Sequence, residues 1–305
     1  MAVGSREPTI RQRAGRVLFR AAPLAYRVLH VYRHPLNRQH RVRAVGRLVR
    51  FELVCSVLGR PTRVPLGERS HLTVYADETN ARKSVNHNPP NWPEMAFWQQ
   101  RLRPGDLFVD VGSNIGIYTV LAQDLGARTI SFEPDRRNCA RLLENLGSNG
   151  YIGEVHNKAV ADRPGVLRLT RGLDSFNHLL LDPPAAAGAV EVETVALDSV
   201  LGDRCAAGLK VDVEGAERLV LAGAERALRE QRIALLQCEW SEGMAERTLG
   251  ETRDAVAALL RAHGYVLHRL DDQGRPFVLD GDVPPGKDVF AAPRRLDGQP
   301  DAARR

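Results

Sequence analysis

The chain has 305 residues and a hydrophobic content of 43%, which is enough to bury one substantial core. Its four cysteines are isolated from one another, which argues against a disulfide framework or a zinc site. No stretch approaches the roughly 20 apolar residues of a membrane span, and no leader pattern opens the chain, so we expect a cytoplasmic protein. The net charge of +6 is uneven, because residues 1–70 hold 15 Arg and no Lys against three Glu, a net of +12, which leaves −6 for the remainder.

The basic N-terminal segment, residues 1–60, is typical of amphipathic helices. Residues 11–33 can form one helix that Pro23 kinks or divides. A second helix is predicted over residues 37–58. Its apolar stripe and its opposite, basic side are formed by Val42, Val45, Val49 and Leu53 and by Arg43, Arg47 and Arg50, respectively. This prefix either contacts an anionic membrane surface or an acidic partner, or packs its apolar face on protein, the more usual arrangement.

A proline-rich connecting region follows at residues 61–93, with one alternating piece, residues 71–75, that is suited to an edge strand. A short helix at residues 94–102 then leads towards the first buried strand, and we expect it to roof a nucleoside site.

Residues 107–134 have the pattern of a strand at residues 107–111, a glycine-bearing turn, a helix at residues 115–125 and a second strand at residues 129–132 that ends on an acid. Gly112 permits the sharp turn, and Gly116 permits close packing of the helix on the strand. Glu133 follows the second strand, where a carboxylate can accept both hydroxyl hydrogens of a ribose. The unit therefore predicts a nucleoside ligand, although the middle glycine of a dinucleotide fingerprint is replaced by Asn114.

The alternation of predicted strands and helices continues to residue 293 and predicts a mostly parallel, doubly wound α/β sheet. A third strand is expected at residues 154–160, and an insertion of strands, rather than a crossover helix, between residues 166 and 196. A fourth βα unit is expected at residues 209–217, with its helix at residues 216–228. Further strands are expected at residues 233–238, 265–270 and 288–292, and a further helix near Thr248 and Glu251. Residues 294–305 are typical of a disordered tail.

Acidic residues stand at or just past the ends of several strands, where ligands of open α/β sheets bind. They are Asp110, Glu133, Asp212, Glu214 and Glu239. Such a group suits a positively charged ligand, a metal ion or a hydroxyl that must lose its proton. A sulfonium methyl donor fits this pattern better than a dinucleotide.

These motifs resemble the FkbM family of S-adenosylmethionine-dependent methyltransferases. The resemblance covers residues 90–292 and is carried by FVDVGSNIGIYTVLA, SFEP, NKAV, VALD, LKVDVEGAE and CEWSEG, while HPLNR at residues 34–38 is similar to prefixes of some members. It implies a Rossmann-like class I methyltransferase sheet at residues 94–293, and methylation of a hydroxyl on a sugar, a glycan, a glycolipid or a natural product.

By this resemblance, the methionine end of the cofactor would be held by Asp110, Gly112, Ser113, Asn114 and Gly116, its ribose by Glu133, and its adenine side by Asn157 to Ala159. The acceptor would lie over Asp212 and Glu239. Candidates for the base are these two acids and His178, and the two acids are also possible ligands of a divalent metal ion. Each has a plainer interpretation: Asp212 as a helix cap, Glu239 as an arginine partner, and His178 as a surface residue.

Two rival functions differ in class. A nucleic-acid methyltransferase would use the arginines on phosphates, but aromatic residues for stacking bases are sparse there, and Asp182-Pro183-Pro184-Ala185 lacks the aromatic residue of an amide-nitrogen motif. A non-catalytic nucleoside-binding protein is disfavoured by the presence of Gly112, Glu133 and Asp212 together.

Overall fold

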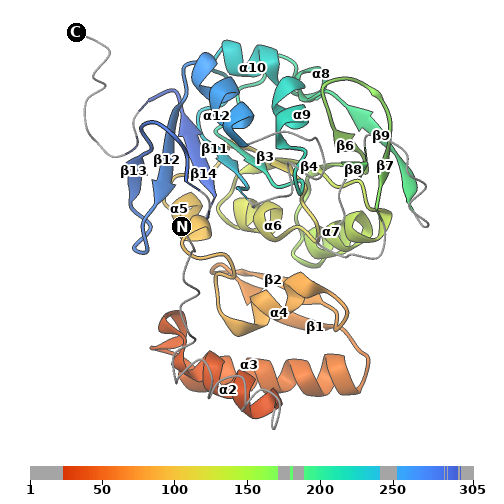
Figure 1. Ribbon diagram of the computed structural model, residues 1–305. Helices are drawn as coiled ribbons and strands as arrows, with labels where there is room; N and C mark the ends of the chain where they lie inside the picture. The colour runs from red at the N-terminus through yellow and green to blue at the C-terminus, as the bar shows by residue number, and fades with distance from the viewer. Residues whose placement is uncertain are drawn as a thin grey trace, which may run out of the picture. The chain divides into compact units, whose positions relative to one another are not determined.

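The computed structural model describes residues 23–170, 179–180, 189–240, 253–284, 286, 288–294 and 296. The chain divides into two compact units (Figure 1). The first comprises Met1–Val64 and Val74–Pro90, and the second comprises Pro65–Thr73 and Asn91–Arg305. The tail predicted at residues 294–305 lies almost wholly outside the described residues.

The first unit is mainly helical. Its helices are α2 (Pro23–Arg33), the 3-10 turn η1 (Pro35–Asn37), α3 (Arg41–Phe51), the π-helical turn η2 (Glu52–Val57) and α4 (Thr79–Asn86). Asn37 is buried and its Nδ2 donates to the carbonyl oxygens of Val31, at 2.9 Å, and Asn86, at 2.8 Å. The HPLNR segment therefore fastens α2 to α4. Strand β1 (Thr62–Leu66) and strand β2 (Ser70–Val74) form a two-stranded sheet; the sequence had indicated only β2, and α4 was also missed.

Most of the apolar stripe predicted on the second helix is exposed, although Val45 is partly buried. The side of α3 that packs inward carries Ala44, Leu48 and Phe51, while Val42 and Val49 are exposed. Arg47, expected on a solvated face, is partly buried, and its Nε donates to the carbonyl oxygen of Val85 at 2.6 Å. The buried face of the helix is therefore formed by Ala44, Leu48 and Phe51 and not by the predicted stripe.

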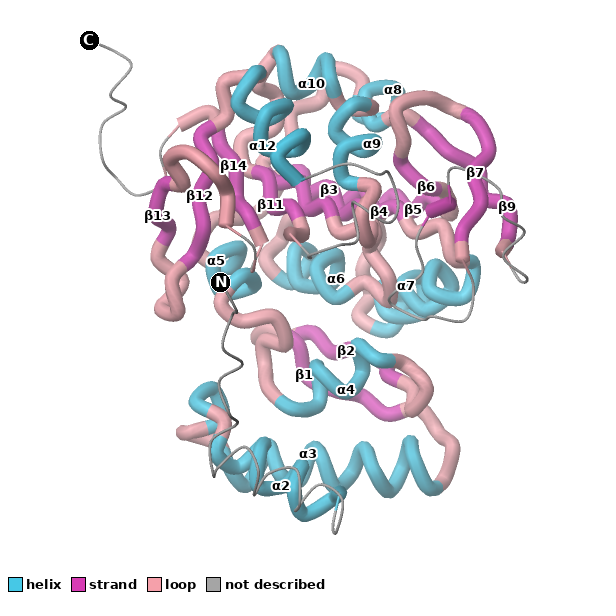
Figure 2. Tube along the Cα trace, in the orientation of Figure 1, coloured by secondary structure: helices cyan, strands magenta, loops and turns pink. Residues whose placement is uncertain are grey.

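The second unit is built on an eight-stranded sheet in the order β13-β12-β14-β11-β10-β3-β4-β5 (Figure 2). Its strands are β3 (Leu107–Val111), β4 (Arg128–Phe132), β5 (Glu154–His156), β10 (Gly208–Val211), β11 (Leu236–Cys238), β12 (Val266–Leu270), β13 (Pro276–Val278) and β14 (Val289–Ala292). The five from β11 to β5 are parallel, and β14, β12 and β13 pair antiparallel. Strand β13 was not predicted from the sequence.

Helices cover both faces of this sheet, which confirms the doubly wound fold. Figure 1 shows α5 (Glu94–Gln99), α6 (Ile117–Asp124) and α7 (Arg136–Ser148) on one face. The other face carries α8 (Leu197–Leu201), α9 (Glu217–Ala222), α10 (Glu225–Arg229) and α12 (Arg253–Ala262). The single helix expected at residues 216–228 is divided near Gly223, where an added Cβ would lie 2.1 Å from the carbonyl oxygen of Ala161. None of the helices that the structure describes is long and apolar enough to cross a membrane.

The expected inserted strands form a second sheet, in the order β6-β9-β7-β8. These strands are β6 (Ala159–Val160), β7 (Gly165–Leu169), β8 (Leu179–Leu180) and β9 (Val190–Val195). The single strand expected at residues 154–160 is therefore wrong, because β5 belongs to the main sheet and β6 to the second. Asn157 lies between them, and its Nδ2 donates to the carbonyl oxygens of Glu133, at 2.8 Å, and Pro134, at 3.0 Å.

Candidate active site

Neighbouring strands place polar side chains in rows on the sheet face that carries α6. The register pairs Asp110 with Lys210 and Lys210 with Gln237, so all three side chains point to one face. They are 0%, 4% and 0% exposed. Two residues further along, Asp212 and Glu239 continue the row on the same face and follow β10 and β11, as the sequence predicted. The carboxyl ends of these strands therefore bring the predicted acids to one face of the sheet.

The loops after β3 and β10 touch where the strand order reverses, the position at which open α/β sheets bind ligands. Gly112 has φ +78°, and an added Cβ would lie 1.8 Å from the backbone oxygen of Asp212. Both loops also hold a non-glycine residue in the left-handed region, Asn114 at φ 51° and Glu214 at φ 53°. Such conformations collect at binding loops. The contact brings the predicted cofactor loop directly beside Asp212.

The loop after β3 is built around the carboxylate of Glu133. The backbone N–H of Asn114 donates to Glu133 Oε2 at 2.8 Å, and that of Asp135 donates to Oε1 at 2.9 Å. Ser113 Oγ donates to the carbonyl oxygens of Asp110 and Phe132, so its hydroxyl supports the loop. Gly116, at φ +90°, opens α6.

Glu133 itself is 6% exposed. Burial raises its pKa to about 7, against the two backbone donors, which lower it. An ionised carboxylate offers about four acceptor positions. Glu133 can therefore keep both backbone bonds and still accept hydrogen bonds from ligand hydroxyls.

Asp110 lies beneath this loop and is fully buried. Thr119 Oγ1 donates to its Oδ2 at 2.6 Å, while its Oδ1 is buried without a hydrogen-bond partner in the structure as described. Burial raises the pKa of Asp110, and the ammonium of Lys210 lowers it. An unused acceptor here would suit a ligand that carries an amino group.

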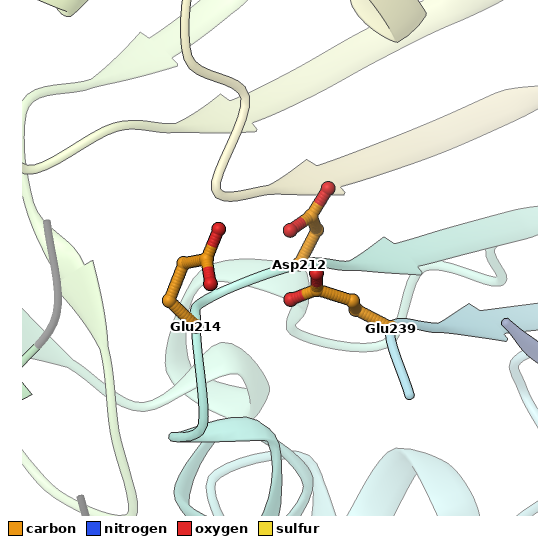
Figure 3. A group of neighbouring side chains, drawn as sticks. All are labelled: Asp212, Glu214 and Glu239. Carbon is orange, nitrogen blue, oxygen red and sulfur yellow. The ribbon is translucent and has the colours of Figure 1, made fainter. Parts of the chain in front are cut away.

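Asp212, Glu214 and Glu239 form an acidic cluster past the ends of β10 and β11 (Figure 3). Each offers a carboxylate oxygen, and these oxygens all lie within 4.8 Å of one another. Three hard oxygen ligands at such separations are a possible divalent-metal site.

Lys210 sets the charge balance of this cluster. Its Nζ lies 2.8 Å from Asp212 Oδ2 and 4.8 Å from the ring centroid of Tyr118. Burial alone would lower the pKa of Lys210, but the carboxylates of Asp212 and Asp110 outweigh it and raise the pKa. Lys210 therefore remains an ammonium that favours the ionised form of Asp212.

The surroundings of Glu239 favour its protonated form. Burial raises its pKa well above the ordinary value, and the carboxylates of Asp212 and Glu214 raise it further. Its Oε2 is buried and has no hydrogen-bond partner among the residues described. Asp212 and Glu239 repel each other in this buried site, which favours retention of a proton by the pair.

The plainer interpretation of Asp212 does not hold. Helix α9 begins at Glu217 after Ala216, so Asp212 does not cap it; Glu217 instead accepts from the backbone N–H of Gly215 at 3.1 Å. His178 lies outside the described residues.

Sequence reasoning missed a further acid at the same edge, beyond Asp212, Glu214 and Glu239. Strand β14 runs antiparallel to β11 and pairs Val289 with Cys238, so one further step places Asp288 opposite Glu239. Burial raises the pKa of Asp288 to about 7, and Asp212 raises it while a hydrogen bond from Gln237 lowers it. No local pattern could have indicated Asp288, because its place depends on a strand pairing across 50 residues.

Gln237 joins this edge to the helices of the same face. Its Nε2 donates to Asp288 Oδ2 at 2.6 Å and to Tyr118 Oη at 3.2 Å, and its Oε1 accepts from Trp98 Nε1. Trp98 belongs to α5, whose Met95 and Phe97 are also buried. Helix α5, predicted as a roof over the nucleoside site, therefore packs against the sheet.

The chain is similar to known methyltransferases. The 31-O-demethyl-FK506 methyltransferase FkbM of Streptomyces tacrolimicus is 32% identical over 201 residues, which are 54% of this chain and 75% of that protein. The C-methyltransferase NovU of Streptomyces niveus is 34% identical over 82 residues, 26% of this chain and 19% of that protein. A solved structure of methyltransferase FkbM from Methylobacillus flagellatus matches with 16% identity and a TM-score of 0.40, over 82% of this chain and 60% of that chain.

The family model for the methyltransferase FkbM domain matches residues 110–267, more than half of the chain. The match begins at Asp110 on β3, includes Glu133, Lys210, Asp212 and Glu239, and ends within β12. The open sheet is thus the Rossmann-like sheet of class I methyltransferases, and the chain belongs to the FkbM methyltransferase family.

Proposed function

We propose that this methyltransferase uses S-adenosylmethionine to methylate a hydroxyl oxygen of a sugar, a glycan, a glycolipid or another natural product. The observation that carries the proposal is the juxtaposition of two acids beside the loop that follows β3: Asp212, whose Oδ2 lies 2.8 Å from Lys210 Nζ, and Glu239, a carboxylate oxygen of which lies within 4.8 Å of one of Asp212. A hydroxyl placed between them meets one proton acceptor and one hydrogen-bond donor.

The residues of the loop after β3 fit the cofactor. Glu133 retains acceptor capacity for the two ribose hydroxyls, and Asp110 Oδ1 is an unused acceptor for an amino group. Gly112 keeps the backbone clear, since a side chain there would strike the Asp212 loop. When bound, the cofactor supplies an electrophilic methyl group on a sulfonium centre.

The acids would then prepare the acceptor. Asp212 accepts the hydroxyl proton, because Lys210 holds it as a carboxylate, and Glu239 donates a hydrogen bond that orients the acceptor. Positioning of this kind supplies most of the acceleration in a displacement reaction, and proton transfer supplies roughly another 10²–10⁴-fold. Asp288, opposite Glu239, is available as a further proton acceptor at the same edge.

A divalent ion is an alternative occupant of the cluster. Asp212, Glu214 and Glu239 would be its ligands, and it would lower the pKa of a bound hydroxyl. A metal site would require Glu239 to lose its proton, so metal binding should be stronger at higher pH. The direct and metal-assisted schemes place the acceptor at the same acids.

The experiment is a screen of hydroxylated sugars and natural products for a mass gain of one methylene, with demethylated cofactor as the second product. The variants are Asp212→Asn and Glu239→Gln, and the control is Asp203→Asn, whose carboxylate is 96% exposed in a surface ion pair. We expect the two site variants to lose about 10²–10⁴-fold in turnover while cofactor affinity survives, and the control to match wild type.

Three readings separate the alternatives. Loss of activity with a chelator, restored by Mg²⁺, favours the metal-assisted scheme. A new carbon–methyl bond in the product, detected by NMR, would show that the acceptor atom is carbon and not the proposed hydroxyl oxygen. Normal turnover in both Asp212→Asn and Glu239→Gln would remove the proposed acceptor site and direct attention to His178.

A further inference from the structure

Helix α3 and the π-helical turn η2 present a second apolar face, separate from the one that packs inside their unit. The inward face consists of Ala44, Leu48, Phe51 and Cys55, all 2% exposed or less. The outward face, called here the α3 surface, consists of Val42 (84% exposed), Val49 (47%), Leu53 (55%) and Val57 (73%).

The spacing of the α3 surface makes it a continuous stripe. Val42, Val49 and Leu53 are seven and four residues apart, so they lie on one side of the helix. From Val42 to Val57 the stripe is roughly 22 Å long at 1.5 Å per residue. Single exposed valines are ordinary on protein surfaces, but a row of this length marks an interaction site.

Arginines follow one edge of this stripe. Arg43 and Arg50 are exposed, and the segment Arg41–Phe51 contains no acidic residue. The adjoining Glu52 is already paired, since its Oε1 accepts from Arg27 Nη1. The whole segment of residues 1–70 carries a net charge of +12. An apolar stripe edged by arginines on a strongly basic segment is the pattern of helices that lie in a membrane interface.

We propose that the α3 surface docks the protein on an anionic lipid bilayer, with its apolar side chains at the acyl boundary and its arginines among the headgroups. Charge complementarity selects this partner. A second copy of the chain would bring two basic segments together, which like-charge repulsion opposes. A nucleic acid would neutralise the arginines but offer no apolar phase to Val49 and Leu53.

The test is cosedimentation of the full chain with vesicles of phosphatidylcholine alone or mixed with phosphatidylserine, at low and high salt. We expect binding to the anionic vesicles only, weakening as salt rises. Each arginine near an anionic surface contributes about fivefold in affinity, so Arg43→Gln with Arg50→Gln should weaken binding by about 30-fold. Val49→Glu with Leu53→Glu should weaken it by more than tenfold, because charges then stand on the inserted face.

Matched controls come from the second unit. Ile152 is 93% exposed and Arg229 has a 61% exposed side chain, so Ile152→Glu and Arg229→Gln change the same residue types elsewhere. Both should bind vesicles as wild type does. Cofactor affinity, measured by calorimetry, should be unchanged in every variant, because the proposed cofactor residues belong to the second unit. The helical signal in circular dichroism, compared with that of wild type, reports that the first unit is intact.

Three results would overturn the proposal. The first is no binding to anionic vesicles even at low salt. The second is wild-type binding by the Val49→Glu, Leu53→Glu variant. The third is a wild-type dimer in light scattering that this variant converts to a monomer, which would make the α3 surface an interface between copies of the chain.

Discussion

Replacement of Lys210 by methionine should raise the pKa of Asp212 and with it the pH at which the enzyme becomes active. The two charged atoms are 2.8 Å apart. At an effective dielectric of about 20 their attraction is about 6 kcal/mol, but the Asp212 side chain is 37% exposed, so solvent screens much of it. An opposite charge at this range typically lowers a carboxyl pKa by about 1–3 units, and its removal should raise the pKa by the same amount.

The sign follows from the role given to Asp212. Only the ionised carboxylate can accept a proton, so activity rises with pH through the pKa of Asp212. In Lys210→Met that rise should occur about 1–3 pH units higher than in wild type. The titration can be measured without a known acceptor, by carbon NMR of labelled aspartate carboxyls, with the Asp212 signal assigned from its absence in Asp212→Asn.

Lys158→Met is the matched control. Its Nζ also lies 2.8 Å from a carboxylate oxygen, that of Glu193, but the two side chains are 42% and 67% exposed. It should leave the Asp212 titration unchanged. Lys210→Met should also reduce stability, because Asp110 then loses its nearest cation, so NMR is performed at a temperature where both variants are folded. An Asp212 titration that does not move in folded Lys210→Met refutes the reasoning.

Three further outcomes are expected. Cofactor affinity, measured by calorimetry, should rise with pH by up to about tenfold per unit below pH 7, because burial raises the pKa of Glu133 to about 7 and its ionised form accepts the ribose hydroxyls. The Glu133→Gln variant should bind the cofactor weakly at every pH. If its affinity still depended on pH, another group would be responsible for the effect. Gly112→Ala should reduce the free energy of unfolding by about 1–3 kcal/mol more than Gly105→Ala, since both have positive φ but only Gly112 faces a backbone atom; equal losses in urea unfolding would contradict this. Gln237→Leu should lower the free energy of unfolding by about 1–3 kcal/mol, because it leaves the buried indole N–H of Trp98 unpaired. The control, Gln100→Leu, changes an exposed residue and should leave the free energy of unfolding nearly unchanged. An unchanged free energy of unfolding in Gln237→Leu would show that the hydrogen bonds of Gln237 contribute little to stability.

The central βαβ unit could be predicted because its determinants are local. The predicted strand Leu107–Val111 is the observed one, and the second strand, predicted from residue 129, begins one residue earlier at Arg128. A buried strand appears as an apolar run, and the turn needs glycine where φ is positive, at Gly112 and Gly116. Asp212 and Glu239 could be predicted as neighbours because consecutive βα units usually form adjacent parallel strands.

Features that depend on distant parts of the chain could not be predicted. The periodicity of residues 37–58 fits two apolar faces, and only the packing of Leu48 and Phe51 shows which one is buried. Strand β6 leaves the main sheet because Asn157 bonds to the turn after β4, a contact between side chain and backbone that no hydropathy pattern contains. The role of Lys210 could have been predicted from the sequence, because a lysine inside an apolar strand is costly to bury without a carboxylate partner, and the strand ends in Asp212.

The charges at the sheet edge constrain what this site can bind. Asp110, Asp212 and Glu239 converge there, and the buried cation among them is Lys210. Burial and the neighbouring carboxylates raise the pKa of Glu239. A ligand that brings positive charge, whether a sulfonium or a metal ion, would lower the cost of ionising these acids, while a neutral ligand would not. We therefore expect binding of a cation to be linked to proton release from the acidic cluster, and the cluster to favour a cationic methyl donor over its neutral product.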